Sequence, residues 1–232
     1  MNLSPPFTGR KKEIEQLRRL HARRKHALIV GSEGIGKSAL VAHLKETLSL
    51  VVCAQSETFG GICHHLETEL NSPAPHLHLV QRKNRLLKIL AETRRTVVFD
   101  GAGWTTPKIS SFLESAMERA PVWICTRSEH AHNIGHFWPL LARFERVELQ
   151  PFHPKETQKL VAAAVREKVV PEKTLDIVEW LHHRAAGSPK ILRELLTEIA
   201  RGHYDLSRPH GLQLLDLDRH IHEMFPVTPF NK

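Results

Sequence analysis

The stretch that decides the fold is Gly31-Ser32-Glu33-Gly34-Ile35-Gly36-Lys37-Ser38, which fits the pattern G-x-x-x-x-G-K-S/T at every fixed position. An apolar strand is predicted before it, at Ala27–Val30, and an amphipathic helix after it, at about Lys37–Leu48. Glycines in such a loop let successive backbone N–H groups turn inward around a phosphate, and the helix start adds the positive end of its dipole. The sequence therefore predicts a phosphate-binding loop (P-loop), with the residues from Gly31 to Ala39 close to a nucleotide.

Two side chains of this loop and one beyond it have expected roles. We expect Lys37 to reach the β- and γ-phosphates of ATP and the hydroxyl of Ser38 to hold Mg²⁺, since Mg²⁺ prefers hard oxygen ligands. A second apolar strand, Thr96–Asp100, ends in a carboxylate that is expected beside the same ion. The predicted cofactors are ATP or ADP with Mg²⁺, and the predicted metal ligands are Ser38 and Asp100.

Short apolar strands alternate with amphipathic helices over residues 1–150. Most of the strands are apolar on both faces, as a parallel sheet covered by helices requires. We expect a three-layer α/β core of the P-loop NTPase type around a central five-stranded parallel sheet. Its predicted strands are Ala27–Val30, Leu50–Ala54, Thr96–Asp100, Val122–Thr126 and Arg146–Leu149. Its predicted helices are Arg10–Ala22, Lys37–Leu48, Phe59–Leu70, Leu79–Thr93 and Lys108–Arg119.

No strand is predicted after Leu149. Three helices follow, each with a proline near its first turn, where the missing N–H costs little. They are Pro154–Lys168, Pro171–Arg184 and Pro189–Arg201. We expect a small helical lid subdomain at residues 151–201 and a C-terminal tail at 202–232, with one short helix at Leu214–Phe225.

Composition limits the function classes. The chain has 33 Lys and Arg against 25 Asp and Glu, a formal charge of +8, which favours acidic partners such as nucleotides or nucleic acid. Its apolar runs are far shorter than the roughly 18–20 residues of a membrane span, and the first ten residues lack the apolar stretch of a secretory signal. Cys53, Cys63 and Cys125 are an odd number of cysteines, expected to be reduced and mostly buried in a cytoplasmic protein.

Basic residues form two runs along the chain. Either run could contact a polyanion, or it could be an ordinary solvated helix face. The first run is Lys11, Lys12, Arg18, Arg19, Arg23, Arg24 and Lys25. The second run is Arg82, Lys83, Arg85, Lys88, Arg94 and Arg95.

Three further segments resemble AAA+ ATPases. Phe7-Thr8-Gly9-Arg10, followed by Glu13 and Leu17, resembles their F-x-G-R-x-x-E-x-x-x-L entry, more narrowly that of STAND regulators and initiator-type (origin-recognition-like) relatives. Val122-Trp123-Ile124-Cys125-Thr126-Arg127 is similar to the fourth-strand motif of STAND proteins, four apolar residues and Thr-Arg. Gly187-Ser188-Pro189 resembles the G-x-P motif of their helical lid.

The resemblance implies roles for residues outside the P-loop. Phe7 and Arg10 would lie near the adenine, together with Pro6. Thr126 and Arg127 would occupy the sensor-1 position, where a polar group detects the γ-phosphate.

Three more residues fall at functional positions of the resembled family. Pro189 and Lys190 fall where the lid approaches the nucleotide, and Lys190 is a possible sensor-2 cation. Arg143 falls where an arginine can enter the neighbouring subunit's site as a finger. Arg143 and Lys190 are equally compatible with solvated helix charges.

One departure concerns hydrolysis. AAA+ enzymes usually follow the Asp of the second motif with a Glu that activates water, whereas Gly101 follows Asp100 here. Glu57, or alternatively Glu129, could supply the carboxylate, and either could be an ordinary helix-entry acid. We therefore expect ATP binding with slow or partner-dependent hydrolysis.

The sequence is compatible with three kinds of output. The first is a nucleotide-gated, self-associating switch that assembles on double-stranded DNA without sequence specificity, like regulators of transposition or replication. The second is a signalling or defence scaffold that works with a separate effector protein. The third is a nucleotide-binding structural subunit without hydrolysis.

Overall fold

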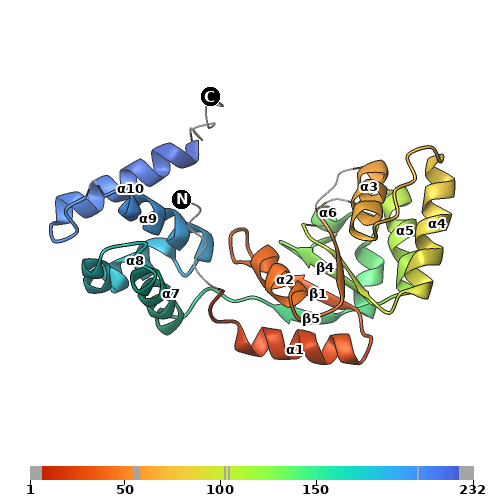
Figure 1. Cartoon of the computed structure of the whole chain (residues 1–232), viewed down its shortest axis with the longest axis horizontal. Helices are drawn as coiled ribbons and strands as arrows, with labels where there is room; N and C mark the ends of the chain where they lie inside the picture. Colours follow the sequence, from red (N-terminus) through yellow and green to blue (C-terminus); the bar gives the residue numbers. More distant parts are fainter. Residues whose placement is uncertain (1–6, 55–57, 102, 104, 203, 225–232) are drawn as a thin grey trace. The chain divides into compact units, whose positions relative to one another are not determined.

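The computed structural model describes residues 7–54, 58–101, 103, 105–202 and 204–224, shown in Figure 1. The chain divides into two compact units. Arg10–Gln150 forms an α/β core unit, and residues 151–224 form a helical unit together with residues 7–9. The chain passes between the units at two points, between Gly9 and Arg10 and between Gln150 and Pro151.

The core unit is built on a parallel sheet with the strand order β2-β3-β4-β1-β5. The predicted five-stranded parallel α/β fold is therefore confirmed. The strand bounds are β1 Ala27–Val30, β2 Leu50–Cys53, β3 Thr96–Phe99, β4 Val122–Thr126 and β5 Glu145–Glu148. Val30 of β1 pairs with Thr126 of β4, and Phe99 of β3 pairs with Ile124, which is two residues before Thr126 in β4. The segments that follow β1, β3 and β4 consequently meet at the carboxyl edge of the sheet.

Helices cover both faces of this sheet. Leu28 and Val30 of β1 pack in a cluster with α3 (Phe59–Glu69), α4 (Leu79–Glu92) and α5 (Pro107–Met117). Successive strand residues point to opposite faces, and the alternate residues Ala27 and Ile29 are buried outside that cluster. Buried leucines of α1 (Lys11–Ala22) and α2 (Lys37–Lys45) also lie outside it, so these two helices cover the second face. Figure 1 shows α1 running beside β5.

Two short elements of the core unit escape the sequence patterns. These are α6 (Ala131–Ile134) and the 3-10 helix η1 (Trp138–Arg143). A helix of four residues cannot display a hydrophobic period, and a 3-10 helix has a different one. The cysteines follow expectation, because all three are free and buried. Burial raises the pKa of Cys53 to about 12 and that of Cys63 to about 11.

The helical unit has its own apolar core. One predicted helix, Pro171–Arg184, is divided in the structure because Ile177 leaves the helical region at φ −111°, ψ 17°. The last helix begins at Pro209 instead of Leu214, with a proline in its first turn, and Leu215 is fully buried in the common core. The elements are α7 Pro154–Arg166, η2 Glu172–Ile177, α8 Val178–Ala185, α9 Pro189–Ala200 and α10 Pro209–Met224. None of the described helices is long and apolar enough to cross a membrane.

The Gly187-Ser188-Pro189 motif builds the start of α9. Gly187 has φ +72°, and a Cβ there would lie 2.8 Å from the Phe152 carbonyl oxygen and 2.8 Å from the Pro151 Cβ. The Phe152 N–H donates to the Gly187 carbonyl at 2.8 Å. Ser188 caps the helix by accepting from the Ile191 N–H, and Pro189 occupies its first turn. The motif thus fastens α9 to the segment where the chain enters the helical unit.

Two partly buried histidines of the core unit have pKa values below the usual one. The Nδ1 atom of His26 accepts from the backbone N–H of Val122 at 3.0 Å. Burial, reinforced by the cations Arg143 and Lys25, lowers the pKa of His26 below its usual 6.5. Burial also lowers the pKa of His21, whose Nδ1 lies 2.8 Å from the Thr96 hydroxyl.

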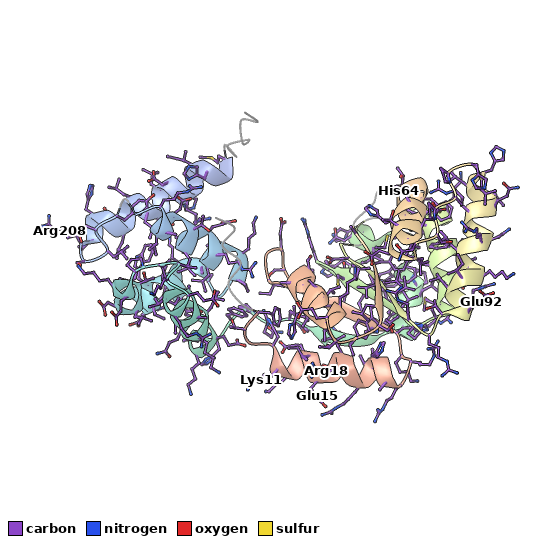
Figure 2. The ribbon with its side chains drawn as sticks, in the orientation of Figure 1. Lys11, Glu15, Arg18, His64, Glu92 and Arg208 are labelled. Carbon is purple, nitrogen blue, oxygen red and sulfur yellow. The ribbon has the colours of Figure 1, made fainter. Side chains whose placement is uncertain are left out.

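We expect the chain to lose stability as the pH falls below about 6.5. The unfolded histidines take up protons there, whereas the folded ones titrate lower, so their contribution is complete above the unfolded pKa and is lost as the pH falls toward the folded values. The measurement is the melting temperature at about pH 7.5 and about pH 5.5. His26→Gln should reduce the difference, and His64→Gln, at an exposed position of α3 (Figure 2), should not. Equal reductions in the two variants would contradict this assignment.

Candidate functional site

The loop between β1 and α2 is closed tightly by its glycines. Gly34 and Gly36 have φ of +74° and +97°, in the left-handed region that favours glycine. A Cβ on Gly31 would lie 2.8 Å from the Ile35 side chain and 3.1 Å from the Leu149 carbonyl oxygen. A side chain at Gly31 would therefore force the loop open.

The start of α2 is suited to an anion. The helix begins at Lys37 after Gly36, which provides no side-chain cap, and the fully described first turn of α2 contains no acidic residue. The first N–H groups of a helix have no partner within it, and they carry the positive end of the helix dipole. A phosphate at this position would satisfy both features.

Lys37 directs its ammonium group back over the loop. Its Nζ donates to the Gly31 carbonyl at 2.6 Å and to the Ser32 carbonyl at 2.9 Å. Burial lowers the pKa of Lys37, and Arg127 lowers it further, while Cys125, Asp100 and Glu33 act in the opposite direction. The ammonium thus lies over the loop, where its present acceptors are two neutral carbonyl oxygens that phosphate oxygens could replace.

Asp100 lies close enough to Lys37 for its carboxylate to raise the pKa of the ammonium. It follows β3, and its N–H donates to the Cys53 carbonyl at 2.9 Å, which extends the pairing of β3 with β2. Burial raises the pKa of Cys125, the Asp100 carboxylate raises it further, and the Lys37 ammonium opposes both. The fully buried Cys125 is therefore next to both charged groups, a position that its sequence pattern did not reveal.

The donor set fits a magnesium ion. The Asp100 carboxylate and the exposed Ser38 hydroxyl are hard oxygen ligands, and both belong to segments that meet at the carboxyl edge of the sheet. Their roles as metal ligands stay predictions.

Arg127 lies at the loop, as its expected role as a γ-phosphate sensor requires. Its guanidinium is 2.8 Å from the carboxylate of Glu33, a residue of the loop, and both side chains are largely exposed, at 67% and 60%. The neighbouring Thr126 hydroxyl donates to the Ser128 carbonyl at 2.8 Å, and the Thr126 carbonyl accepts from the Gly31 N–H at 3.3 Å. The Glu33–Arg127 pair was not expected from the sequence.

Replacement of Glu33 with glutamine should tighten ATP binding up to about fivefold. Glu33 competes with the γ-phosphate for Arg127, and an exposed ion pair of this kind contributes up to about 1 kcal/mol. The test is a titration with ATP and with ADP, in which ADP, lacking the γ-phosphate, should gain less. Glu46→Gln, at an exposed position just after α2, is the matched control. An affinity for ATP that is unchanged or lower would count against the competition.

Comparison with solved structures identifies the architecture. The sequence matches no protein-family model and no curated protein, so the likeness is one of three-dimensional structure. The ORC1 protein of Aeropyrum pernix, solved in complex with DNA, superposes with a TM-score of 0.68 at 15% identity, covering 98% of this chain and 70% of that one. A Walker-type ATPase of Pyrococcus abyssi gives 0.62 at 18% identity, covering 97% of this chain and 80% of that one. The chain has the AAA+/STAND-type P-loop ATPase fold.

A STAND protein with a tetratricopeptide repeat sensor from Pyrococcus horikoshii shares the fold. It superposes with a TM-score of 0.56 at 19% identity, covering 90% of this chain and 32% of that protein. The chain thus spans about a third of that STAND protein. The similarity does not extend to the remaining two thirds or so of that protein.

The Arg10 side chain forms hydrogen bonds within the protein, although its expected contact was with the adenine. Its side chain is only 4% exposed and its φ is +60°. The guanidinium donates to the carbonyl of Ile35 at 3.0 Å, to the carbonyl of Gln150 at 2.5 Å and to the Glu13 carboxylate at 3.2 Å. It therefore ties the P-loop to the last residue of the core unit. An adenine contact by Arg10 stays a prediction.

The other expected contacts lie in the helical unit. Phe7 belongs to it, Pro189 opens α9, and Lys190 is 3.8 Å from Glu194 on the same helix. Their approach to the nucleotide stays a prediction.

Arg143 lies at the amino edge of the sheet. It ends η1, is exposed, and lies close enough to His26 to affect its pKa, and His26 directly precedes β1. The P-loop follows the other end of β1, about 13 Å away along four strand residues. Arg143 is therefore remote from the P-loop of its own chain, and a finger role would have to be exerted on a neighbour.

Neither carboxylate that the sequence offers for the activation of water is found beside Asp100 in the part of the chain that the structure describes. Gly101, with φ +80°, follows Asp100. Glu57 lies outside the described residues. The Glu129 carboxylate is 2.6 Å from the Arg146 guanidinium of β5, and β5 lies on the far side of β1 from β3 and Asp100. Either residue's role as a base stays a prediction.

Proposed function

We propose that the chain binds Mg-ATP in the Gly31–Ser38 loop and acts as a nucleotide-gated, self-associating switch with slow hydrolysis. The observation that carries the proposal is the position of the Lys37 ammonium, which donates to two carbonyls of the loop. The Asp100 carboxylate is close enough to affect the pKa of this lysine, and the helix that begins at Lys37 has no side-chain cap. A triphosphate offers that ammonium stronger, charged acceptors than the carbonyls do.

The γ-phosphate is the gating group in this proposal. Arg127 exchanges its exposed partner Glu33 for the γ-phosphate, and it returns to Glu33 when the γ-phosphate leaves. The Ser38 hydroxyl and the Asp100 carboxylate would hold Mg²⁺, which neutralises charge on the phosphate oxygens when it is bound. Gly101 supplies no carboxylate after Asp100, so we expect turnover well below the ~1–100 per second of activated phosphoryl-transfer enzymes.

The position of Arg143 supports the self-association part of the proposal, provided that Arg143 acts as a finger. An arginine at the amino edge can reach only a neighbour's P-loop, which requires a head-to-tail contact between copies. We propose that such assemblies form on duplex DNA. The net charge of +8 supports this, and the structurally similar ORC1 protein was solved in complex with DNA.

Mixing two inactive variants tests the arrangement. Lys37→Ala and Arg143→Ala are each expected to abolish ATP hydrolysis, but by removing different halves of a shared site. In an equimolar mixture about a quarter of the sites combine an intact P-loop with an intact neighbouring Arg143, so about a quarter of the activity should return. No recovery, or an active Arg143→Ala variant, would reject the finger role.

A further inference from the structure

The two basic runs of the sequence look alike but differ in the structure. In the second run, Arg82 donates to both carboxylate oxygens of Glu67 at 2.7 Å, and the Glu67 side chain is only 4% exposed. Arg85 is bonded to the Ser72 carbonyl at 3.0 Å and to the Ser72 hydroxyl at 2.7 Å. Arg95 donates to the Leu50 carbonyl at 2.8 Å. These three cations of the second run are therefore engaged within the fold, whereas Lys88 and Arg94 of the same run are exposed but separated along it.

The first run instead forms an exposed basic face on α1. Leu17 and Leu20 are buried beneath the helix. On the opposite side, within the fully described α1, the exposed acidic residue is Glu15, which is paired with Arg19 at 3.0 Å. Figure 2 shows Lys11, Glu15 and Arg18 on the side of α1 that is turned away from the sheet. The basic face consists of Lys11, Lys12, Arg18, Arg19 and Arg23, and it continues into the exposed Arg24 and Lys25.

We propose that this basic face of α1 binds the phosphate backbone of duplex DNA. The proposal rests on the proposed assembly on DNA and names the surface responsible. The 12 residues of α1 extend about 18 Å, which is the length of about five base pairs along the duplex axis at ~3.4 Å each. Such contacts fix the position of the protein on DNA without reading its sequence.

The chemistry of the face favours DNA over an anionic membrane. Helices that lie on membranes bury large apolar side chains in the lipid. The exposed large apolar residues of the described chain lie elsewhere, for example Val80, Trp138 and Met224. On the described α1, the exposed positions between the cations hold Glu15, Gln16 and Ala22. The face offers charge without an apolar anchor.

The position of α1 also connects the basic face to the nucleotide. The helix follows Arg10 directly, and the Arg10 guanidinium is bonded to Ile35 of the P-loop. The basic face of α1 is therefore connected to the P-loop through the buried Arg10 side chain.

The test compares two triple variants with the same loss of charge. Lys12→Gln, Arg18→Gln and Arg23→Gln remove three cations of the basic face. Lys155→Gln, Lys159→Gln and Arg166→Gln remove three exposed cations of α7. All six positions are exposed, and circular dichroism verifies that both variants fold. Binding is measured by fluorescence anisotropy with a labelled duplex of arbitrary sequence, in Mg-ATP, over a series of salt concentrations.

The α1 variant should bind about 100-fold more weakly at ~100 mM salt, and its plot of log K against log[salt] should be shallower by about 2.7, or 0.9 for each lost phosphate contact. The α7 variant should resemble the wild type. Equal losses in the two variants overturn the α1 surface while leaving assembly on DNA intact. No binding by the wild type at low salt overturns both proposals. Binding to phosphatidylserine vesicles is measured in parallel by sedimentation. A loss of vesicle binding in the α1 variant, with DNA binding unchanged, assigns the face to membranes and also overturns the inference.

Discussion

Replacement of Lys37 with alanine is expected to raise the Kd for Mg-ATP at least about 100-fold. The ammonium makes charge-assisted hydrogen bonds worth about 1.5–3 kcal/mol each, and the loss of two corresponds to two or more powers of ten in affinity. Its present acceptors are the Gly31 and Ser32 carbonyls, so phosphate oxygens can take their place without a rearrangement of the loop. The measurement is isothermal titration of each variant with ATP and magnesium.

Lys45→Ala is the matched control for this prediction. Lys45 ends the same helix, and its ammonium is paired with Glu69 at 2.7 Å on the surface. Its removal takes away one positive charge from α2 but none from the loop. Lys45 is eight residues from Lys37, about 12 Å along the helix, so screening should keep the change in Kd below about threefold. Equal ATP affinity of the Lys37 variant and the wild type would remove the site assignment.

Replacement of Arg10 with asparagine should destabilise the core unit by about 2–4 kcal/mol. The guanidinium satisfies two backbone carbonyls and a carboxylate in a buried position, and each buried acceptor left without a donor costs about 1–3 kcal/mol. Asparagine tolerates the φ of +60° at this position, so the loss reports on the guanidinium and not on backbone strain. ATP binding should weaken as well, because Ile35 lies within the P-loop.

Hydrogen exchange of the β1 and β4 amides measures this loss in the core unit alone, which matters because a chain of two units need not unfold in one step. Arg19→Asn is the control, since Arg19 forms only an exposed pair with Glu15. Arg10→Lys should fall between, because a lysine is a point donor without the planar fork. Protection in Arg10→Asn equal to that of the wild type would show that the clamp contributes nothing.

Local sequence patterns were enough to predict the scaffold. A glycine loop between an apolar strand and a helix has one well-known geometry, and strands that are apolar on both faces require a covered parallel sheet. These patterns predict the P-loop and the strand that ends in Asp100, whereas the place of Arg127 after β4 was implied by the resemblance to AAA+ and STAND proteins. Short elements such as α6 and η1 carry no such pattern.

The partners of individual side chains could not be predicted in the same way. Arg10 bonds to Gln150, 140 residues further along the chain, and no local period encodes that contact. Arg82 and Arg18 both stand in basic helices, yet a buried carboxylate from α3 meets only the first. Whether a charge is internal or free to bind a ligand depends on the tertiary fold, and this decided between the two basic runs.

The most direct test of the account is a crystal structure of the chain with magnesium and a non-hydrolysable ATP analogue. We expect the phosphates within the Gly31–Ser38 loop, with Lys37 Nζ moved from the loop carbonyls to the phosphate oxygens and a magnesium ion between Ser38 and Asp100. An analogue bound elsewhere, with Lys37 still on the carbonyls of Gly31 and Ser32, would contradict it.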